Sequence, residues 1–247
     1  MKKITAIIVM SQILIGYAQA QIAVKAETLY TATTSPIQNA VVLIEGGKIK
    51  AVGKAADITI PSNYKVIQAK TATPGLIDAR TLIGISGILN ISIDQDQLEK
   101  SSPVQPELRA IDAYNPNETL VKYARSCGIT TIHTGHGVGA LFSGQTMIAK
   151  TKPGTTDNVI IKPLSMLAMT LGPSVSGNYS SPGTKAKEVS MIRAELIKAQ
   201  DYQKKMSNKD SSKRPAFDMK MDVLSQLLKG EIKALITANS SVDIMNA

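Results

Sequence analysis

Residues 73–79 read Thr-Pro-Gly-Leu-Ile-Asp-Ala, and the pattern of the sequence changes at Pro74. Before this proline, the apolar stretches 40–45 and 48–52 flank Gly46-Gly47. Glycines tolerate positive φ angles, so this arrangement predicts a β-hairpin with a two-residue turn. After the proline, short apolar stretches alternate with stretches of helical periodicity. The stretch 73–79 therefore marks the border between an antiparallel β module and an α/β region.

The sequence predicts further elements on both sides of this border. Residues 22–30 and 66–67 are expected to be strands of the first region. In the second region we expect strands at 76–79, 129–133 and 233–237, with room for one or two more within 158–171. We expect a first helix over 115–127, with Asn117 as its N-cap. Two later helices are expected, one around Val189, Ile192 and Leu196 and one along Phe217, Met221, Leu224 and Leu228. The polar, basic stretch 204–214 is expected to be a solvated loop. Strands that alternate with helices predict a parallel α/β arrangement.

The composition is that of a globular protein. Of 247 residues, 43% are apolar and 19% are charged, which is too apolar for a disordered chain. The formal net charge is +9, but the basic residues are scattered and only 4% of the residues are aromatic. Few aromatic side chains are therefore available to stack on bases, and we expect no nucleic-acid partner.

The first twenty residues have the pattern of a secretory signal peptide. Lys2 and Lys3 precede the mostly apolar stretch 4–17, and Ala18-Gln19-Ala20 is a small-x-small cleavage site. We therefore expect export, to a periplasm or out of the cell, with no membrane span after cleavage; the alternative is a buried N-terminal helix. Cys127 is the one cysteine, which rules out an internal disulfide, and we expect it to be a small buried side chain.

Several stretches resemble one enzyme superfamily. Residues 73–79 resemble the strand-1 signature P-G-L-I-D-x-H-x-H of the amidohydrolase superfamily, and residues 42–53 resemble the hairpin of its small β-sandwich. Residues 127–131, 143–146 and 228–232 resemble landmarks of the imidazolonepropionase-related branch. The resemblance implies an α/β fold class with a β-sandwich module at 21–73 and a partial (β/α) TIM-type barrel at 74–247.

The resemblance also implies one or two divalent metal ions, zinc among them, held by His-x-His at the end of strand 1. Such a metal lowers the pKa of a bound water. In this chain the two His-x-His positions are Arg80 and Leu82, and Thr237 stands where a later histidine is expected. Neither a protonated guanidinium nor a leucine side chain ligates a metal.

The chain contains two histidines, His133 and His136, at the carboxyl end of the predicted strand 129–133. Active sites of barrels lie at that end, so both are candidate metal ligands. The alternative is a pair of loop histidines that hydrogen-bond to backbone, because only two ligands are visible where a metal takes three or four. Asp78 is expected to be a structural hydrogen-bonding residue.

Two functional hypotheses remain open. The first is a hydrolase of non-peptide C–N bonds with a metal-activated water, weak or inactive as this chain, because about 170 residues follow Pro74 where a complete barrel takes ~250. A partner copy or a missing C-terminal half would then be expected. The second is an exported, non-catalytic protein that binds an anionic small molecule with Arg80 and the glycine-rich turn 135–139. Arg80 alternatively pairs with an acid at the barrel mouth.

Overall fold

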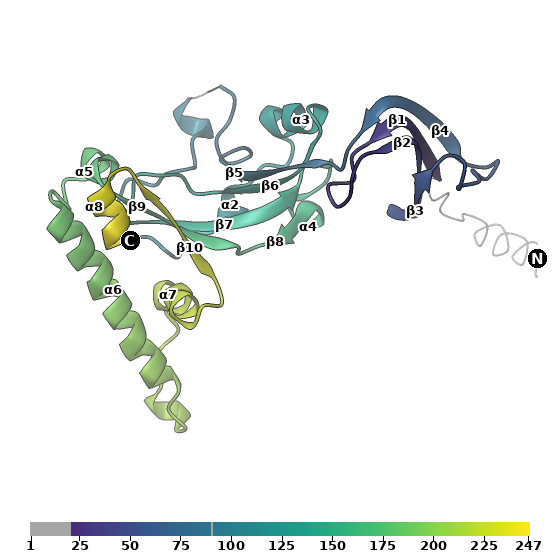
Figure 1. Ribbon diagram of the computed structural model, residues 1–247. Helices are drawn as coiled ribbons and strands as arrows, with labels where there is room; N and C mark the ends of the chain where they lie inside the picture. Colours follow the sequence, from purple (N-terminus) through teal and green to yellow (C-terminus); the bar gives the residue numbers. More distant parts are fainter. Residues whose placement is uncertain (1–20, 90) are drawn as a thin grey trace, which may run out of the picture. The chain divides into compact units, whose positions relative to one another are not determined.

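The computed structural model describes residues 21–89 and 91–247, and the predicted signal peptide lies outside this part. The chain divides into two compact units, of which the first ends at Pro74 and the second begins at Gly75 (Figure 1). Each unit has its own sheet. Among the described residues, no helix combines the length and apolar character needed to cross a membrane.

The first unit is built on a four-stranded sheet in the order β3-β2-β1-β4. Its strands are β1 (Ile22–Leu29), β2 (Ile37–Glu45), β3 (Lys48–Lys54) and β4 (Lys65–Ala72). The hairpin predicted at Gly46-Gly47 is confirmed, because β2 and β3 pair antiparallel and both glycines have positive φ angles, 60° and 72°. The strand predicted at 66–67 is longer than expected, since β4 runs parallel to β1 over its whole length.

One face of this sheet carries the core of the first unit. Ala23, Val41 and Leu43 are buried there, against partly buried residues of the segment that follows β3, such as Ile58 and Tyr64. Among the described residues, the first unit has one sheet. A β-sandwich needs a second sheet that faces the first, and residues 21–73 do not form one.

The second unit contains a curled, mixed sheet in the order β10-β9-β7-β6-β5, with β8 beside β7 (Figure 1). These strands are β5 (Leu76–Thr81), β6 (Ile129–Gly135), β7 (Phe142–Lys150), β8 (Ile160–Lys162), β9 (Met166–Leu171) and β10 (Lys233–Ala238). The predicted parallel pairs exist, because β5 runs parallel to β6 and β9 runs parallel to β10. The expected parallel arrangement does not extend through the whole sheet, because β7 lies between β6 and β9 and runs antiparallel to both.

The helices of the second unit are η1 (Ser92–Asp94), α2 (Ala110–Ala113), α3 (Thr119–Ser126), α4 (Thr156–Val159), α5 (Pro173–Asn178), α6 (Lys185–Met206), η2 (Ser211–Lys213), α7 (Met219–Lys229) and α8 (Ser241–Asn246). One apolar cluster joins β7 and β9 to α6 and α7, and includes the fully buried Phe142 and Leu224. A second cluster joins β6 and β7 to α2, α3 and α4 through Ile132 and Val121. The long α6 and the shorter α7 also share a hydrogen bond, in which Gln203 Nε2 donates to the Ser225 carbonyl at 2.7 Å.

Four local predictions are wrong. Glu118 rather than Asn117 caps α3, because its carboxylate accepts the Leu120 N–H at 2.6 Å. Cys127 is exposed at the C-terminus of α3 rather than buried. Phe217 lies before the start of α7 and is exposed. The first residues of the expected loop 204–214 belong to α6, because the helix continues to Met206.

Candidate functional site

The carboxyl end of β5 contains a β-bulge. Asp78 pairs with Ile132 and Thr81 pairs with Thr134, so Ala79 and Arg80 both lie opposite His133. A bulge interrupts the ladder and redirects a side chain, and bulges are frequent beside active sites. The Asp78 carboxylate accepts the backbone N–H of Arg80 at 3.1 Å, which confirms the prediction that Asp78 is a structural hydrogen-bonding residue.

His133 ties the bulge to the rest of the sheet. Its side chain is buried, its Nδ1 lies 2.9 Å from the Ala79 carbonyl, and its Nε2 lies 2.7 Å from Thr146 Oγ1. Because a carbonyl only accepts, Nδ1 carries the proton, and Nε2 of the neutral ring accepts from the Thr146 hydroxyl. Burial lowers the pKa of His133, a hydrogen bond to Ala79 opposes this shift, and the Arg80 charge adds to it. His133 is therefore neutral at pH 7, and both of its nitrogens are bonded.

Thr146 continues this network into β9. It is fully buried, and its hydroxyl oxygen accepts the Met166 N–H at 3.1 Å. The same oxygen lies 3.2 Å from the Met166 carbonyl. Thr146 lies on β7, so a chain of hydrogen bonds from Ala79 to Met166 crosses four strands.

Arg80 is a half-buried cation at the end of β5. Its Nη1 donates to the Thr81 carbonyl at 3.2 Å, and its Nη2 donates to the His136 carbonyl. Burial lowers its pKa. In the described part of the chain, no carboxylate forms a salt bridge with Arg80. The predicted alternative, a pair between Arg80 and an acid, is therefore not found among residues 21–89 and 91–247.

His136 follows β6 and has a different environment from His133. It is 5% exposed, and neither ring nitrogen has a hydrogen-bond partner within the described structure. Burial is the main cause that lowers its pKa to about 4, the Arg80 charge contributes, and Asp96 opposes the shift. The ring packs against Gly144, where the φ angle is +132° and an added Cβ would lie 2.4 Å from His136 Cδ2. A residue with a side chain at 144 would therefore displace the imidazole.

Two glycines of the turn 135–139 have N–H groups that are bonded within the protein. The Gly137 N–H donates to the Gln97 carbonyl at 2.6 Å, and the Gly139 N–H donates to Thr170 Oγ1 at 2.9 Å. Each donor is thus already used within the protein. Of the two parts of the anion site predicted from the sequence, Arg80 therefore remains as the positively charged group.

The residues described here do not fit the divalent metal that the resemblance implies. Both nitrogens of His133 are bonded within the protein, and Leu82 and Thr237 supply no imidazole. Across residues 21–89 and 91–247, no group of three or more His, Cys, Asp or Glu side chains is arranged to hold a metal ion. The prediction that His133 and His136 are metal ligands remains a hypothesis. It requires His133 to break its hydrogen bond with Ala79 or with Thr146.

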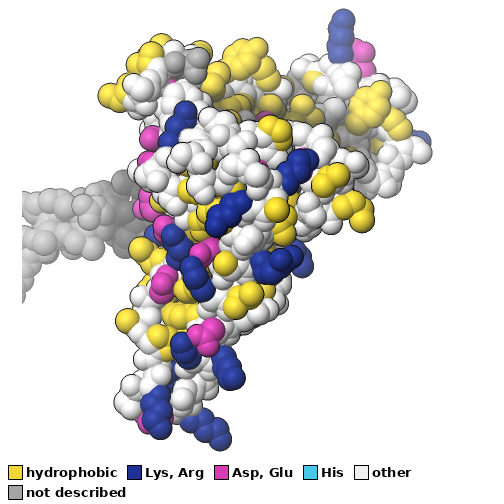
Figure 2. Space-filling model, turned by 90° about the vertical axis from the view of Figure 1, so that its left-hand side faces the viewer, with side chains coloured by type: hydrophobic (Ala, Val, Ile, Leu, Met, Phe, Trp, Pro, Cys, Tyr) yellow, Lys and Arg dark blue, Asp and Glu magenta, His cyan; other side chains and the backbone are white. Residues whose placement is uncertain are grey.

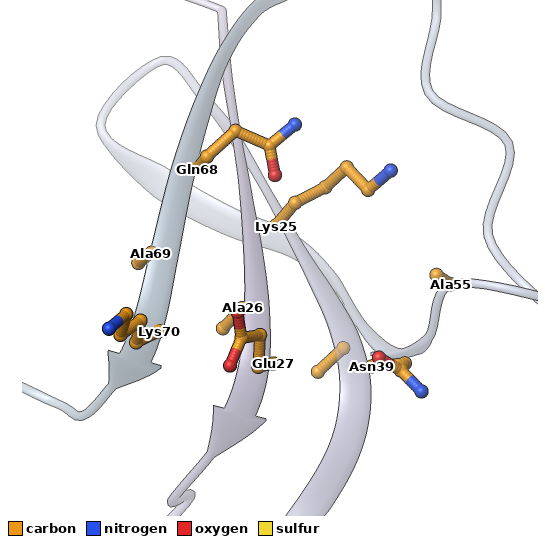
Figure 3. A pocket seen from close by; sticks show the side chains of 9 residues that line it. Lys25, Ala26, Glu27, Asn39, Ala55, Gln68, Ala69 and Lys70 are labelled. Carbon is orange, nitrogen blue, oxygen red and sulfur yellow. The ribbon is translucent and has the colours of Figure 1, made fainter.

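The surface adds little to this site. On the face seen in Figure 2, Lys and Arg side chains are scattered and acidic side chains lie among them. A shallow hollow of about 570 Å³ lies on the first unit, between strands β1, β2 and β4 and Ala55 (Figure 3). Its polar side chains, Lys25, Glu27, Asn39, Gln68 and Lys70, are all exposed. Their charges are mixed, so the hollow does not define a ligand class.

Sequence reasoning missed Thr146 and the Ala79 carbonyl as parts of the site. Thr146 ends the stretch Ser143-Gly144-Gln145-Thr146, whose resemblance to a family landmark was the available signal. The role of the Ala79 carbonyl depends on a bulge, and no local pattern marks it.

The polar cluster thus lies at the carboxyl ends of the parallel pair β5 and β6, which is the edge of the sheet where active sites of barrels lie. Among solved structures, an amidohydrolase from Thermotoga maritima is similar to this chain, with a TM-score of 0.84 and 24% sequence identity over 91% of the chain. The chain has the fold of this amidohydrolase and spans 60% of its length. No protein-family model and no curated protein matches the chain.

Two further solved structures overlap with short parts of the chain. A molinate hydrolase is 27% identical over 27% of this chain and 15% of its own, with a TM-score of 0.25. An ochratoxinase from A. niger is 25% identical over 28% of this chain and 17% of its own, with a TM-score of 0.23. Overlaps of this quality carry no argument, and the comparisons lend no support to a non-catalytic binding protein or to loss of activity.

Proposed function

We propose that this chain belongs to a hydrolase that cleaves non-peptide C–N bonds, as the sequence resemblance implies. The observation that carries the proposal is the position of Arg80, His133 and His136. All three lie at the carboxyl ends of β5 and β6, in a fold shared with an amidohydrolase. Active sites of barrel enzymes lie at that edge of the sheet.

The residues of this chain have separate tasks in this proposal. Arg80 orients the substrate, because its guanidinium keeps free N–H donors beyond the two bonded to carbonyls. His136 is neutral and buried, and it offers one donor and one acceptor to a substrate that displaces its neighbours. The described residues do not hold a metal, so we route no step through one. We also propose the imidazolonepropionase-related branch, because residues 127–131, 143–146 and 228–232 resemble its landmarks, and export, because residues 1–20 have a signal pattern.

The test is hydrolysis by the protein isolated from its own cells. A panel of cyclic amides, N-acyl amino acids and carbamates would be followed by release of ammonia or a primary amine. Each compound would be assayed with added zinc and after treatment with a chelator. We expect turnover of at least one compound, and a lower kcat/KM for Arg80→Gln than for the control Arg109→Gln, an exposed position directly before α2.

Folded protein that turns over no compound on the panel in either condition would overturn the proposal. Circular dichroism and size-exclusion chromatography of the same samples establish that the protein is folded. Equal kcat/KM values for Arg80→Gln and Arg109→Gln would remove Arg80 from the site.

A further inference from the structure

We propose that Arg80 binds a carboxylate group of the substrate, and that His133 is a positioning residue that holds Arg80 in place through the bulge at Ala79. This inference deepens the proposed function, on which it rests, by naming a substrate class. The test below measures binding alone, so it can fail or succeed independently of hydrolysis.

The bulge is what brings Arg80 to the end of the sheet. Ala79 and Arg80 are the two residues of β5 that have no ladder partner of their own. Without a ladder partner, the Ala79 carbonyl depends on the His133 ring, which donates to it from Nδ1 at 2.9 Å. The Asp78 carboxylate fixes the Arg80 N–H at 3.1 Å. The imidazole and the carboxylate thus hold the carbonyl and the N–H of the one peptide unit that joins Ala79 to Arg80.

The guanidinium is held but not saturated. Of its five N–H donors, one on each terminal nitrogen is bonded to a carbonyl, of Thr81 and of His136. The remaining donors include Nε–H, and no acid of residues 21–89 or 91–247 neutralises the charge in a salt bridge. A half-buried cation of this kind favours an anionic partner, and a planar fork of donors matches a carboxylate.

The charge of the site selects a monoanion. His133 and His136 are neutral at pH 7, which leaves Arg80 as the cation among the three side chains. Asp96 opposes the shift at His136, but its side chain is exposed and water screens its charge. A carboxylate balances one guanidinium, whereas a phosphate dianion would leave excess negative charge in a partly buried site.

The binding experiment follows the Arg80 Nε–H signal in the full chain labelled with ¹⁵N-arginine. Sodium acetate and propionate are the probes, acetamide and propionamide are the uncharged analogues, and inorganic phosphate is the competing anion. Arg80→Gln assigns the signal by its loss. We expect acetate and propionate to shift this signal saturably, while the amides do not, and while the signal of Arg109, paired with Asp112 at 3.8 Å, stays unchanged.

Variants at position 133 test the positioning role. Asn places an amide N–H where His133 has Nδ1–H, so His133→Asn keeps the donor to Ala79 and should bind acetate within about threefold of wild type. Gln reaches toward Thr146 instead, so His133→Gln should weaken acetate binding about tenfold or more, by analogy with the loss of groups that orient metal ligands. Circular dichroism of both variants establishes that each is folded before its acetate affinity is compared.

The possible outcomes separate clearly. An Arg80 signal that ignores acetate, or that responds equally to acetamide, overturns the carboxylate assignment, as does a response to phosphate alone. Equal acetate affinity of the Asn and Gln variants overturns the positioning role of His133. Acetate binding with the expected variant order, in a protein that hydrolyses nothing, would support this inference and refute the proposed function.

Discussion

Replacing His136 with leucine is expected to protect the second unit against acid. His136 has a pKa of about 4 in the folded protein, against 6.5 for an unperturbed imidazole. Below pH 6.5 the unfolded chain takes up a proton that the folded chain does not, so stability falls as the pH drops, until about pH 4. The difference between the two pKa values corresponds to about 3 kcal/mol, of which about 2 kcal/mol is lost between pH 7 and pH 4.5. Leucine has no proton to take up and removes this loss.

At pH 7 the same substitution is expected to be neutral or stabilising. Both nitrogens of His136 are buried without a partner in the described structure, and each such group costs about 1–3 kcal/mol. The free energy of unfolding would be measured in urea at pH 7 and pH 4.5, with hydrogen exchange of β6 and β7 peptides to follow the second unit. A loss of 2 kcal/mol or more at pH 7, or an unchanged pH dependence, would refute the reasoning.

The matched control is the other histidine. His133→Leu leaves the Thr146 hydroxyl and the Ala79 carbonyl without their imidazole partner, and is expected to destabilise the second unit by about 2–4 kcal/mol at pH 7. The two histidines lie three positions apart, yet their substitutions by leucine should act in opposite directions. Effects of the same sign would show that the environments assigned to them are wrong.

Three further predictions concern the same unit. Thr146→Val is expected to lower the free energy of unfolding by about 2–4 kcal/mol because it leaves His133 Nε2 and the Met166 N–H without a partner, while Thr146→Ser should cost about 1 kcal/mol in the same urea experiment. Gly144→Ala is expected to displace the His136 ring, and should both lower the melting temperature and shift the imidazole signals in an NMR spectrum. Cys127 is exposed and should react completely with a thiol reagent in the native protein, so slow labelling that requires urea would contradict its position at the end of α3.

Local patterns predicted the elements whose cause is local. The β2–β3 hairpin depends on two glycines that allow the positive φ angles of its turn. Strand β7 escaped prediction because almost all of its residues are buried, which removes the alternation that marks a strand with one exposed face. It also contains Gly144 and Gln145, which lower the local strand signal. The Gln145 N–H donates to the Leu108 carbonyl, a partner far away in the sequence.

The sequence predicted which residues form the candidate site, but not which hydrogen bonds each of them makes. The sequence places Arg80, His133 and His136 at the ends of neighbouring strands, and the structure does the same. Which histidine is bonded and which is not depends on Ala79, on another strand, and on the φ angle of Gly144. A spacing of three residues predicts two equal ligands, because it carries no information on these contacts.

The sign of the charge at this site follows from Arg80. Burial is the main cause that lowers the pKa of both histidines, and the Arg80 charge acts in the same direction at each ring. The field of this charge opposes a divalent cation placed at either ring, and it attracts an anion instead. Asp96 is the acid that counteracts this field at His136, and it is exposed, so water screens its charge. Removing the cation with Arg80→Gln should therefore raise the pKa of both imidazoles and weaken carboxylate binding in the same variant. An NMR titration of the two rings that shows no change would mean that Arg80 does not set the electrostatics of this site.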